Sequence, residues 1–157
     1  MPTPSAPPQF LPIEAQWCLE RPAAQAAAPP CIQLEVARSF QQQSWGLMGR
    51  PPLAPLHGMW FPWPQPQVLK FWMHRTPAPL DMLFLRSGRV IAIEAGAKPC
   101  PHLPCRSYGP DEPADGVVEL AAGEAARLGL TVGAAARITP LPAPAPPAAR
   151  RAAPARG

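Results

Sequence analysis

The distribution of proline limits where this chain can form regular secondary structure. Of its 157 residues, 27 are proline; eight of these lie in residues 1–30 and six in residues 140–157, where alanine supplies most of the remainder. Segments rich in proline and alanine bury too little apolar surface to offset chain entropy. We therefore expect disordered segments at 1–30 and 140–157, and a single folded domain over residues 31–139.

The formal net charge of +4 is concentrated near the C-terminus rather than on the expected domain. Arg150, Arg151 and Arg156 have no acidic residue near them, whereas residues 31–139 carry only a small excess of basic side chains. Nucleic-acid-binding proteins usually present a clustered basic face on a recognisable module. Neither feature is visible here, so we do not expect nucleic acid as a partner.

No apolar run in the chain approaches the ~20 residues that a membrane-spanning helix requires. The first residues, 1–9, also lack the positive region and the apolar region of a secretory signal peptide. The sequence therefore predicts no transmembrane segment, and export would require a start upstream of Met1.

Alternation of apolar and polar residues predicts several strands. Residues 31–37 alternate as a half-buried strand does, and residues 80–86 are apolar on both faces, so that strand should lie deep in a sheet. Ser87-Gly88 fits a two-residue hairpin turn that leads into a partner strand. This partner and the other short strands are expected at residues 90–95, 59–61, 70–74, 116–120 and 135–139.

Two short helices are expected beside these strands. Ser39 offers an oxygen that caps one helix, and residues 123–128 form an alanine-rich second helix with Gly129 at its end. Residues 96–115 form a long loop with five prolines, a length that usually indicates a function or a cross-link. The pattern predicts an α+β domain with a mainly antiparallel sheet, or a partly closed barrel, and two short helices.

Several short motifs recur in an order that is typical of one protein family. They are Ile32-Gln-Leu-Glu-Val-Ala, Gly46-Leu47-Met48 with Arg50, Phe71-Trp72-Met73, Pro79-Leu80-Asp81, Glu119-Leu120 and Val132-Gly133. With these motifs, residues 31–139 resemble the domain of unknown function 192 family, small bacterial and archaeal proteins with no established biochemical activity. The proline-rich cysteine loop is most similar to cyanobacterial members. Because family members are often exported, the resemblance implies a periplasmic location if a signal lies upstream.

The candidate catalytic residues are Asp81, His74 and Arg75. Asp81 is expected on a buried strand face, where it needs a partner such as His74 or Arg75 from the adjacent strand. An acid/base enzyme would use Asp81 and His74, since imidazole titrates near neutrality. The alternative, which we favour, is a structural role in which Asp81 accepts hydrogen bonds from loop amides. Members of the family that the chain resembles often have Lys-Asn at the positions of His74 and Arg75.

Two tryptophans are candidates for ligand binding. Trp60 and Trp63 lie in a proline-rich segment, whereas most other aromatic residues fall at strand and helix positions that are typical of a core. If Trp60 and Trp63 are exposed together, they form an aromatic platform for a carbohydrate, a peptide or an envelope component.

The four cysteines allow more than one chemistry. A disulfide between Cys100 and Cys105 would cross-link the long loop, and Cys18 could pair with Cys31. Alternatively, Cys100, His102 and Cys105 offer soft sulfur and nitrogen ligands that suit zinc. Their spacing is not that of a zinc ribbon, and free thiols are the third alternative.

No motif of a familiar enzyme class is present. The chain lacks a nucleophile elbow, a P-loop, a dinucleotide-binding glycine fingerprint and the His-Glu-x-x-His motif. We therefore expect a non-enzymatic binding or accessory protein with no resident cofactor, and the resemblance implies that it is associated with the cell envelope. The competing hypothesis is a metal-binding protein or an acid/base enzyme that uses Asp81 and His74.

Overall fold

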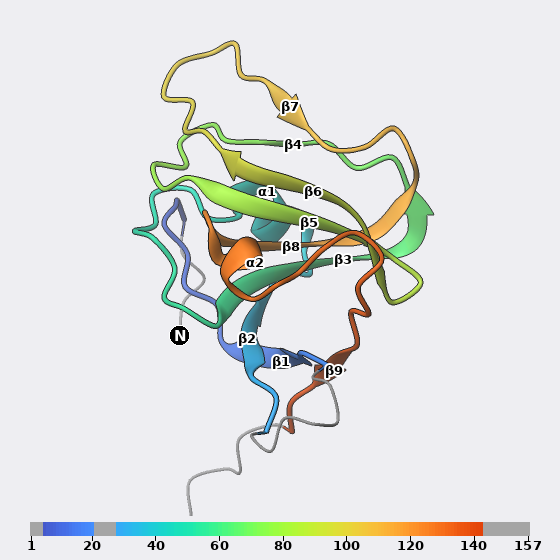
Figure 1. Cartoon of the computed structure of the whole chain (residues 1–157). Helices are drawn as coiled ribbons and strands as arrows, with labels where there is room; N and C mark the ends of the chain where they lie inside the picture. Colours follow the sequence, from blue (N-terminus) through green and yellow to red (C-terminus); the bar gives the residue numbers. More distant parts are fainter. Residues whose placement is uncertain (1–4, 21–27, 143–157) are drawn as a thin grey trace, which may run out of the picture.

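A seven-stranded mixed sheet organises the residues that the computed structural model describes, 5–20 and 28–142 (Figure 1). The elements in chain order are β1 (Ile13–Cys18), β2 (Cys31–Val36), α1 (Phe40–Trp45), β3 (His57–Gln67), β4 (Phe71–Trp72), β5 (Leu80–Arg86), β6 (Arg89–Ala97), β7 (Ser107–Tyr108), β8 (Ala114–Ala121), α2 (Glu124–Arg127) and β9 (Ile138–Pro140). The sheet order is β6-β5-β8-β3-β2-β1-β9, and β4 and β7 pair separately. The α+β prediction is confirmed, with a sheet that stays open rather than closing into a barrel.

One strand pair departs from the antiparallel pattern. β2 and β3 run parallel, with Leu34 beside Gly58 and Val36 beside Trp60. Parallel neighbours need a crossover connection, which here contains α1. As the sequence predicts, Ser39 caps this helix: its Oγ accepts a hydrogen bond from the amide of Gln42 at 3.1 Å.

The hairpin of β5 and β6 forms where the sequence predicts it. Ser87 and Gly88 have φ angles of 49° and 74°. Positive φ at both central residues is the geometry of the type I′ turn, whose twist matches that of the flanking strands.

The sheet extends beyond the expected domain limits. β1 pairs with β2 and β9, and a disulfide joins Cys18 to Cys31 across the first of these pairs. The expectation of a disordered segment at 1–30 is therefore wrong for β1. Its residues alternate in burial as a strand does, but the many prolines around it led to the expectation of disorder. Residues 1–4, 21–27 and 143–157 of the expected terminal segments lie outside the described residues.

β3 is longer than the three-residue strand expected at 59–61. It continues through Pro62, Pro64 and Pro66. Its pairing with β2 ends at Trp60, and its pairing with β8 is irregular after Pro62. Proline has no N–H to donate, so it is tolerated where a strand edge has lost its partner.

The expected strand at 70–74 is only partly formed. β4 is two residues long and pairs with β7, which lies inside the expected loop at 96–115. The two strands therefore form a small ribbon beyond β6, at the top of Figure 1. A disulfide between Cys100 and Cys105 closes the part of the loop that precedes β7.

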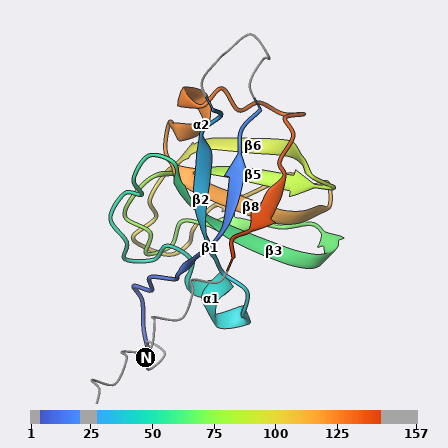
Figure 2. The same ribbon diagram turned by 90° about the horizontal axis from the view of Figure 1, so that it is seen from below.

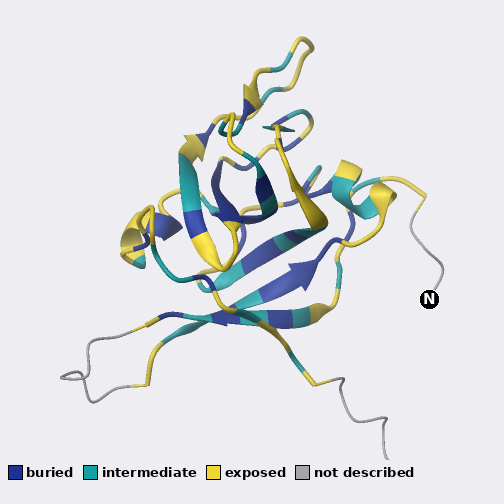
Figure 3. Cartoon of the chain, turned by 90° about the vertical axis from the view of Figure 1, so that its right-hand side faces the viewer, coloured by how far each residue is buried: buried dark blue, intermediate teal, exposed yellow. Residues whose placement is uncertain are grey.

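Side chains are buried on both faces of the sheet, so the protein has two hydrophobic clusters. One, which we call the α2-side core, includes Leu34, Leu83, Leu85, Val118, Leu120 and Ala125. The other, the α1-side core, includes Leu47, Met59, Phe61, Met82, Phe84 and Val117. β5 and β8 contribute to both and are buried along most of their lengths, and Figure 3 colours the whole cartoon by burial. Figures 1 and 2 show α1 and α2 on opposite sides of the sheet.

A buried ion pair ties the N-terminal segment to the sheet. Arg50 Nη1 and Nη2 donate to Oε1 and Oε2 of Glu35 at 2.8 and 2.9 Å, and both side chains are about nine-tenths buried. The Leu11 amide also donates to Glu35 Oε1 at 2.8 Å, and Arg50 Nη1 donates to the Gln9 carbonyl at 3.1 Å. The pair therefore holds Gln9 and Leu11, which precede β1, against β2.

We expect Arg50→Met to lower the free energy of unfolding by about 3–5 kcal/mol, because Glu35 would keep a buried charge without its counter-ion. Denaturant unfolding at pH 7 measures the change. Arg38→Met is the matched control: the Arg38–Glu14 pair is largely exposed and should contribute at most about 1 kcal/mol. Equal losses in the two variants would contradict the role of the buried pair.

Candidate functional site

A cavity of about 340 Å³ opens on the α1 side of the sheet. Its walls come from α1 and the turn after it, from β3, and from the segment between residues 70 and 76. The aromatic side chains that line it are Phe40, Trp45, Phe61, Trp63, Phe71 and Trp72. Pockets that bind small molecules occupy roughly 300–1,000 Å³ and have mostly apolar walls. The cavity therefore has the size and the lining of a small-molecule site.

Phe71 is the centre of this aromatic wall. Its ring packs edge-on against Phe61, Trp63 and Phe84, with centroid separations of 5.0, 6.1 and 6.2 Å. Pairing of β4 with β7 places Phe71 beside Tyr108 and holds it over the sheet. The wall is thus preformed by contacts within the protein.

A row of glutamates and methionines crosses the same face of the sheet. In register, Glu35 of β2 lies beside Met59 of β3, Met59 beside Glu119 of β8, Glu119 beside Met82 of β5, and Met82 beside Glu94 of β6. Residues paired across strands point to the same face. This acid–methionine row places Glu119 at the middle of the sheet, where it lines the cavity.

Glu119 has an unusual electrostatic environment. It is only 4% exposed, and its carboxyl has no ion pair or hydrogen bond with any residue in the ranges 5–20 and 28–142. Burial in apolar surroundings disfavours the charged form and raises the pKa of Glu119 to about 8. At neutral pH the side chain is therefore mainly a neutral carboxylic acid, which can donate one hydrogen bond and accept others.

Two basic side chains lie at the cavity wall. Lys70 Nζ donates to the Gly109 carbonyl at 2.6 Å and to Asp111 Oδ1 at 3.0 Å, so its charge is committed to the loop before β8. His74 packs against Trp72, with ring centroids 4.9 Å apart. Both residues line the cavity, but neither is an ion-pair partner of Glu119.

Asp81 lies on the opposite face from the cavity, because it is in register with Leu120 of the α2-side core. Its Oδ1 accepts a hydrogen bond from the Gly96 amide at 2.9 Å. Its Oδ2 accepts from the amides of Gly123 and Ala125 at 3.1 and 3.0 Å. These bonds fasten the start of α2 and the end of β6 to β5.

The expectation that His74 or Arg75 is the partner of Asp81 is wrong. That expectation placed residues 70–74 next to β5, whereas β4 pairs with β7 and β5 pairs with β6 and β8. Asp81 and His74 are therefore not brought together. Arg75 is exposed and does not line the cavity; its backbone bonds to Cys100 and Gly49.

The two candidate tryptophans face different sides of the sheet. Trp63 lines the cavity beside Phe71. Trp60 packs against the α2-side core and covers Gly116, where an added Cβ would lie 2.1 Å from the tryptophan ring. The structure therefore does not form a joint platform from Trp60 and Trp63.

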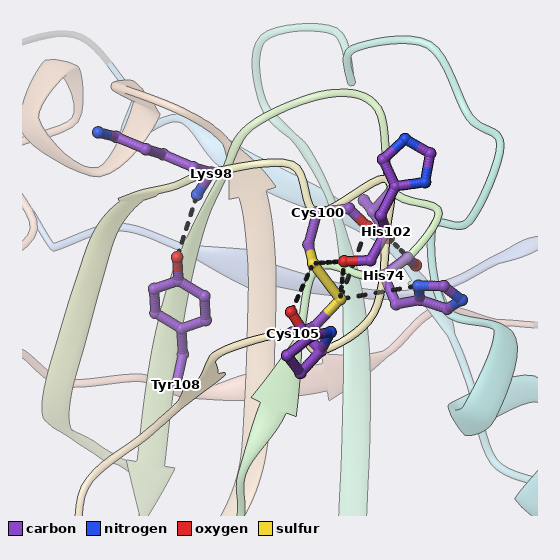
Figure 4. Close-up of a disulfide and its surroundings, with 8 residues drawn as sticks. His74, Lys98, Cys100, His102, Cys105 and Tyr108 are labelled. Atoms are coloured by element: carbon purple, nitrogen blue, oxygen red, sulfur yellow. Dashed lines mark hydrogen bonds between the residues drawn. A yellow bond between two sulfur atoms is a disulfide. The ribbon is translucent and has the colours of Figure 1, made fainter.

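The disulfide between Cys100 and Cys105 lies beside His74 (Figure 4). His74 Nδ1 is 3.7 Å from Cys105 Sγ, whereas the ring of His102 points away from the two sulfurs. Oxidised sulfurs are not thiolate ligands, so Cys100, His102 and Cys105 do not form a zinc site in this state. In the part of the chain that the structure describes, no three His, Cys, Asp or Glu side chains are grouped to hold a metal.

Glu119 is the candidate site residue that the sequence reasoning missed. Its signal is a glutamate inside the expected strand 116–120, where Val117 shares its face and Val118 and Leu120 occupy the other. A charged residue in a strand with apolar residues on both faces contradicts the usual pattern of a buried strand. Such a contradiction is itself an indication of a site.

The DUF192 family model, described as Uncharacterized ACR, matches residues 21–138. A crystal structure from Sinorhizobium meliloti 1021, provisionally described as a transcription regulator, is 31% identical with a TM-score of 0.65. The match covers 81% of this chain and 92% of that one. A protein of unknown function from Novosphingobium aromaticivorans DSM 12444 is 28% identical with a TM-score of 0.65, covering 86% and 94%. No curated protein sequence matches the chain.

We expect Asp81→Asn to lower the free energy of unfolding by about 2–4 kcal/mol. The amide keeps one acceptor oxygen for three backbone donors, and its NH₂ group would face at least one buried N–H. Thermal and denaturant unfolding measure this loss. Asp115→Asn is the control, because the Asp115 carboxylate accepts one exposed bond, from the Ser87 amide. A ligand-binding defect in Asp81→Asn without a loss of stability would contradict the structural role.

Glu119→Gln should flatten the pH dependence of stability. In the wild type the glutamate titrates near 4.5 when unfolded and near 8 when folded. The folded state therefore binds more protons between these values, and stability falls as the pH rises through them. Glutamine stays neutral at every pH. Between pH 4 and pH 8 the free energy of unfolding should therefore fall by a few kcal/mol less in the variant than in the wild type.

Unfolding at pH 4, 6 and 8 measures this difference within each variant, so that any general effect of the substitution cancels. Glu94→Gln, the half-buried end of the same row, is the matched control and should leave the wild-type profile unchanged. Parallel profiles for wild type and Glu119→Gln would show that Glu119 is not neutral in the folded protein.

Proposed function

This chain belongs to the DUF192 family, and from its structure we propose that it is a non-enzymatic binding protein for a small organic molecule. One observation carries the proposal: an aromatic-walled cavity contains a buried carboxyl group that no described residue neutralises. Apolar walls supply contact area, and a single well-placed polar group orients the ligand. Aromatic rings add rigid contact surface at little cost in side-chain entropy.

We propose that the cavity is the binding site, instead of the surface expected around Trp60, Trp63, His74, Arg75 and Asp81. Of those five residues, Trp63 and His74 line the cavity. Asp81 is fully engaged by backbone amides on the other face, which leaves no reason to assign it to a ligand.

Acid–base catalysis is a second candidate function, and it rests on Glu119 rather than on Asp81. A carboxyl group whose pKa is about 8 can both donate and accept a proton near neutrality, as a general acid or base must. His74 lines the same cavity. Recovery of a bound ligand unchanged after long incubation supports binding, whereas formation of a product that Glu119→Gln abolishes supports catalysis.

The proposed location is the oxidising envelope of the cell. Two disulfides support it, since such bonds form and persist in oxidising compartments. Within residues 5–20 and 28–142, none of the helices has the length and hydropathy of a membrane span. The proposal is therefore a protein that meets its ligand in the envelope.

We do not extend to this chain the regulatory role in the description of the S. meliloti protein. The described residues carry equal numbers of basic and acidic side chains. Binding to DNA depends on neutralising phosphates with an excess of lysine and arginine. That balance favours a small ligand over a nucleic acid.

A ligand in the cavity should change the fluorescence of Trp45, Trp63 and Trp72, which line it. We expect hits from a library of small aromatic and aliphatic fragments to raise the melting temperature of the wild type. Trp72→Ala, at a half-exposed wall position, should weaken such a hit about tenfold through lost ring contact.

Trp60→Phe is the matched control for this screen, because Trp60 faces the α2-side core. It should leave the affinity of each hit within about twofold. Hits that respond to Trp60→Phe but not to Trp72→Ala would place the binding site elsewhere, and the proposed function would then be wrong.

A further inference from the structure

We propose that the ligand of this cavity is an organic cation, with its charged nitrogen beside Glu119 and its apolar part against the aromatic wall. This inference rests on the proposed binding function. It adds the chemical class of the ligand, which follows from how the protein treats its other buried acids.

Glu119 differs from the other two buried glutamates of the described chain in having no cationic partner. Glu35 is paired with both terminal nitrogens of Arg50. Glu124 is paired with Arg127, and the pKa of Glu124 is lowered chiefly by that hydrogen bond. Glu119 lies two places from Glu35 in the acid–methionine row, yet it faces the cavity instead of an arginine. The missing partner is a positive charge.

The groups around Glu119 favour a cation over a neutral polar ligand. Aromatic faces attract cations through their negative π-clouds, most strongly in tryptophan and where water is excluded. The cavity is lined by three tryptophans and three phenylalanines. On either side of Glu119 in the row lie the thioethers of Met59 and Met82, both fully buried. The aromatic rings provide an electron-rich surface in the cavity, and the two buried methionines place no charge beside Glu119.

Sugar-like ligands fit this cavity less well, because most of the polar side chains that line it already make hydrogen bonds within the protein. The Gln43 amide nitrogen donates to the carbonyls of Ala37 and Pro62. The hydroxyl groups of Ser44 and Thr76 donate to the backbone carbonyls of Phe40 and His74 respectively. Few donors therefore remain to match a ring of ligand hydroxyl groups.

The remaining charges near the cavity leave Glu119 as the group that responds to the ligand. From the segment after β3, Lys70 is held by Asp111 and Gly109, and His74 packs on Trp72. In the row, Glu35 of β2 is paired with Arg50, and Glu94 of β6 lies beyond Met82. The lining residues from α1 and β3 carry no titratable side chain.

Binding of a cation should be coupled to release of a proton from Glu119. The empty site holds a neutral carboxylic acid at pH 7, and a cation beside it favours the carboxylate. For a pKa of about 8, the ionised fraction rises roughly fifty-fold between pH 6 and pH 8. The affinity for a ligand of fixed positive charge should rise by about the same factor. A neutral ligand that accepts a hydrogen bond from Glu119 would instead bind more weakly above pH 8.

Isothermal titration calorimetry of the full chain with benzyltrimethylammonium, whose charge does not titrate, tests the proposal. We expect affinity that rises from pH 6 to pH 8 and a heat that varies with the buffer, which reports proton release. Glu119→Gln should lose at least tenfold in affinity and all pH dependence, whereas Glu94→Gln should match the wild type. 2-Phenylethanol, a neutral aromatic probe, should bind at least tenfold more weakly than the cation.

The outcomes separate this inference from the function on which it rests. If 2-phenylethanol binds as well as the cation, or if the affinity for benzyltrimethylammonium does not rise from pH 6 to pH 8, the cationic class is wrong while the binding function stands. Because that comparison uses the wild type alone, it remains decisive even if Glu119→Gln fails to fold. If neither probe nor any library fragment binds, the proposed function itself is wrong.

Discussion

The burial of β8 at the centre of the sheet is the constraint on which the rest of the structure depends. β3 and β5 hydrogen-bond to its two edges, and cores cover both of its faces. A strand shielded in this way admits only side chains that are apolar or that find a polar partner. Val117, Val118 and Leu120 meet that requirement, and Glu119 does so only as a neutral acid. The cavity lies beside Glu119, whose carboxyl group has no polar partner among the described residues.

The buried carboxyl groups of the described residues have three different kinds of environment. Asp81 is surrounded by backbone amides, which stabilise its charge and join α2 to the sheet. Glu35 and Glu124 are each paired with an arginine. Glu119 has neither kind of partner among the described residues, and it is also the one that lines a cavity. This contrast within a single fold supports a role in ligand binding better than the residue's burial alone does.

The elements that the sequence predicts correctly are those that depend on neighbours along the chain. The alternation in β2, the Ser39 cap and the Ser87-Gly88 turn all depend on residues a few positions apart. The errors concern pairing between distant segments. β1 was expected to be disordered because its surroundings are rich in proline, and β4 pairs with β7 rather than with β5. The wrong partner for Asp81 followed directly from that misplaced strand.

The sequence by itself determined the family, the α+β class and two members of the cavity wall, Trp63 and His74. It also placed Glu119 in a strand, because strand formation follows from residues that are close in the chain. Only the tertiary structure decided that Glu119 lies between Met59 and Met82 and lines one cavity together with aromatic side chains of α1, β3 and β4. The reason is physical: strand register and the packing of α1 and β4 depend on contacts between segments far apart in the sequence. A buried acid becomes a candidate site only when those contacts leave a cavity beside it.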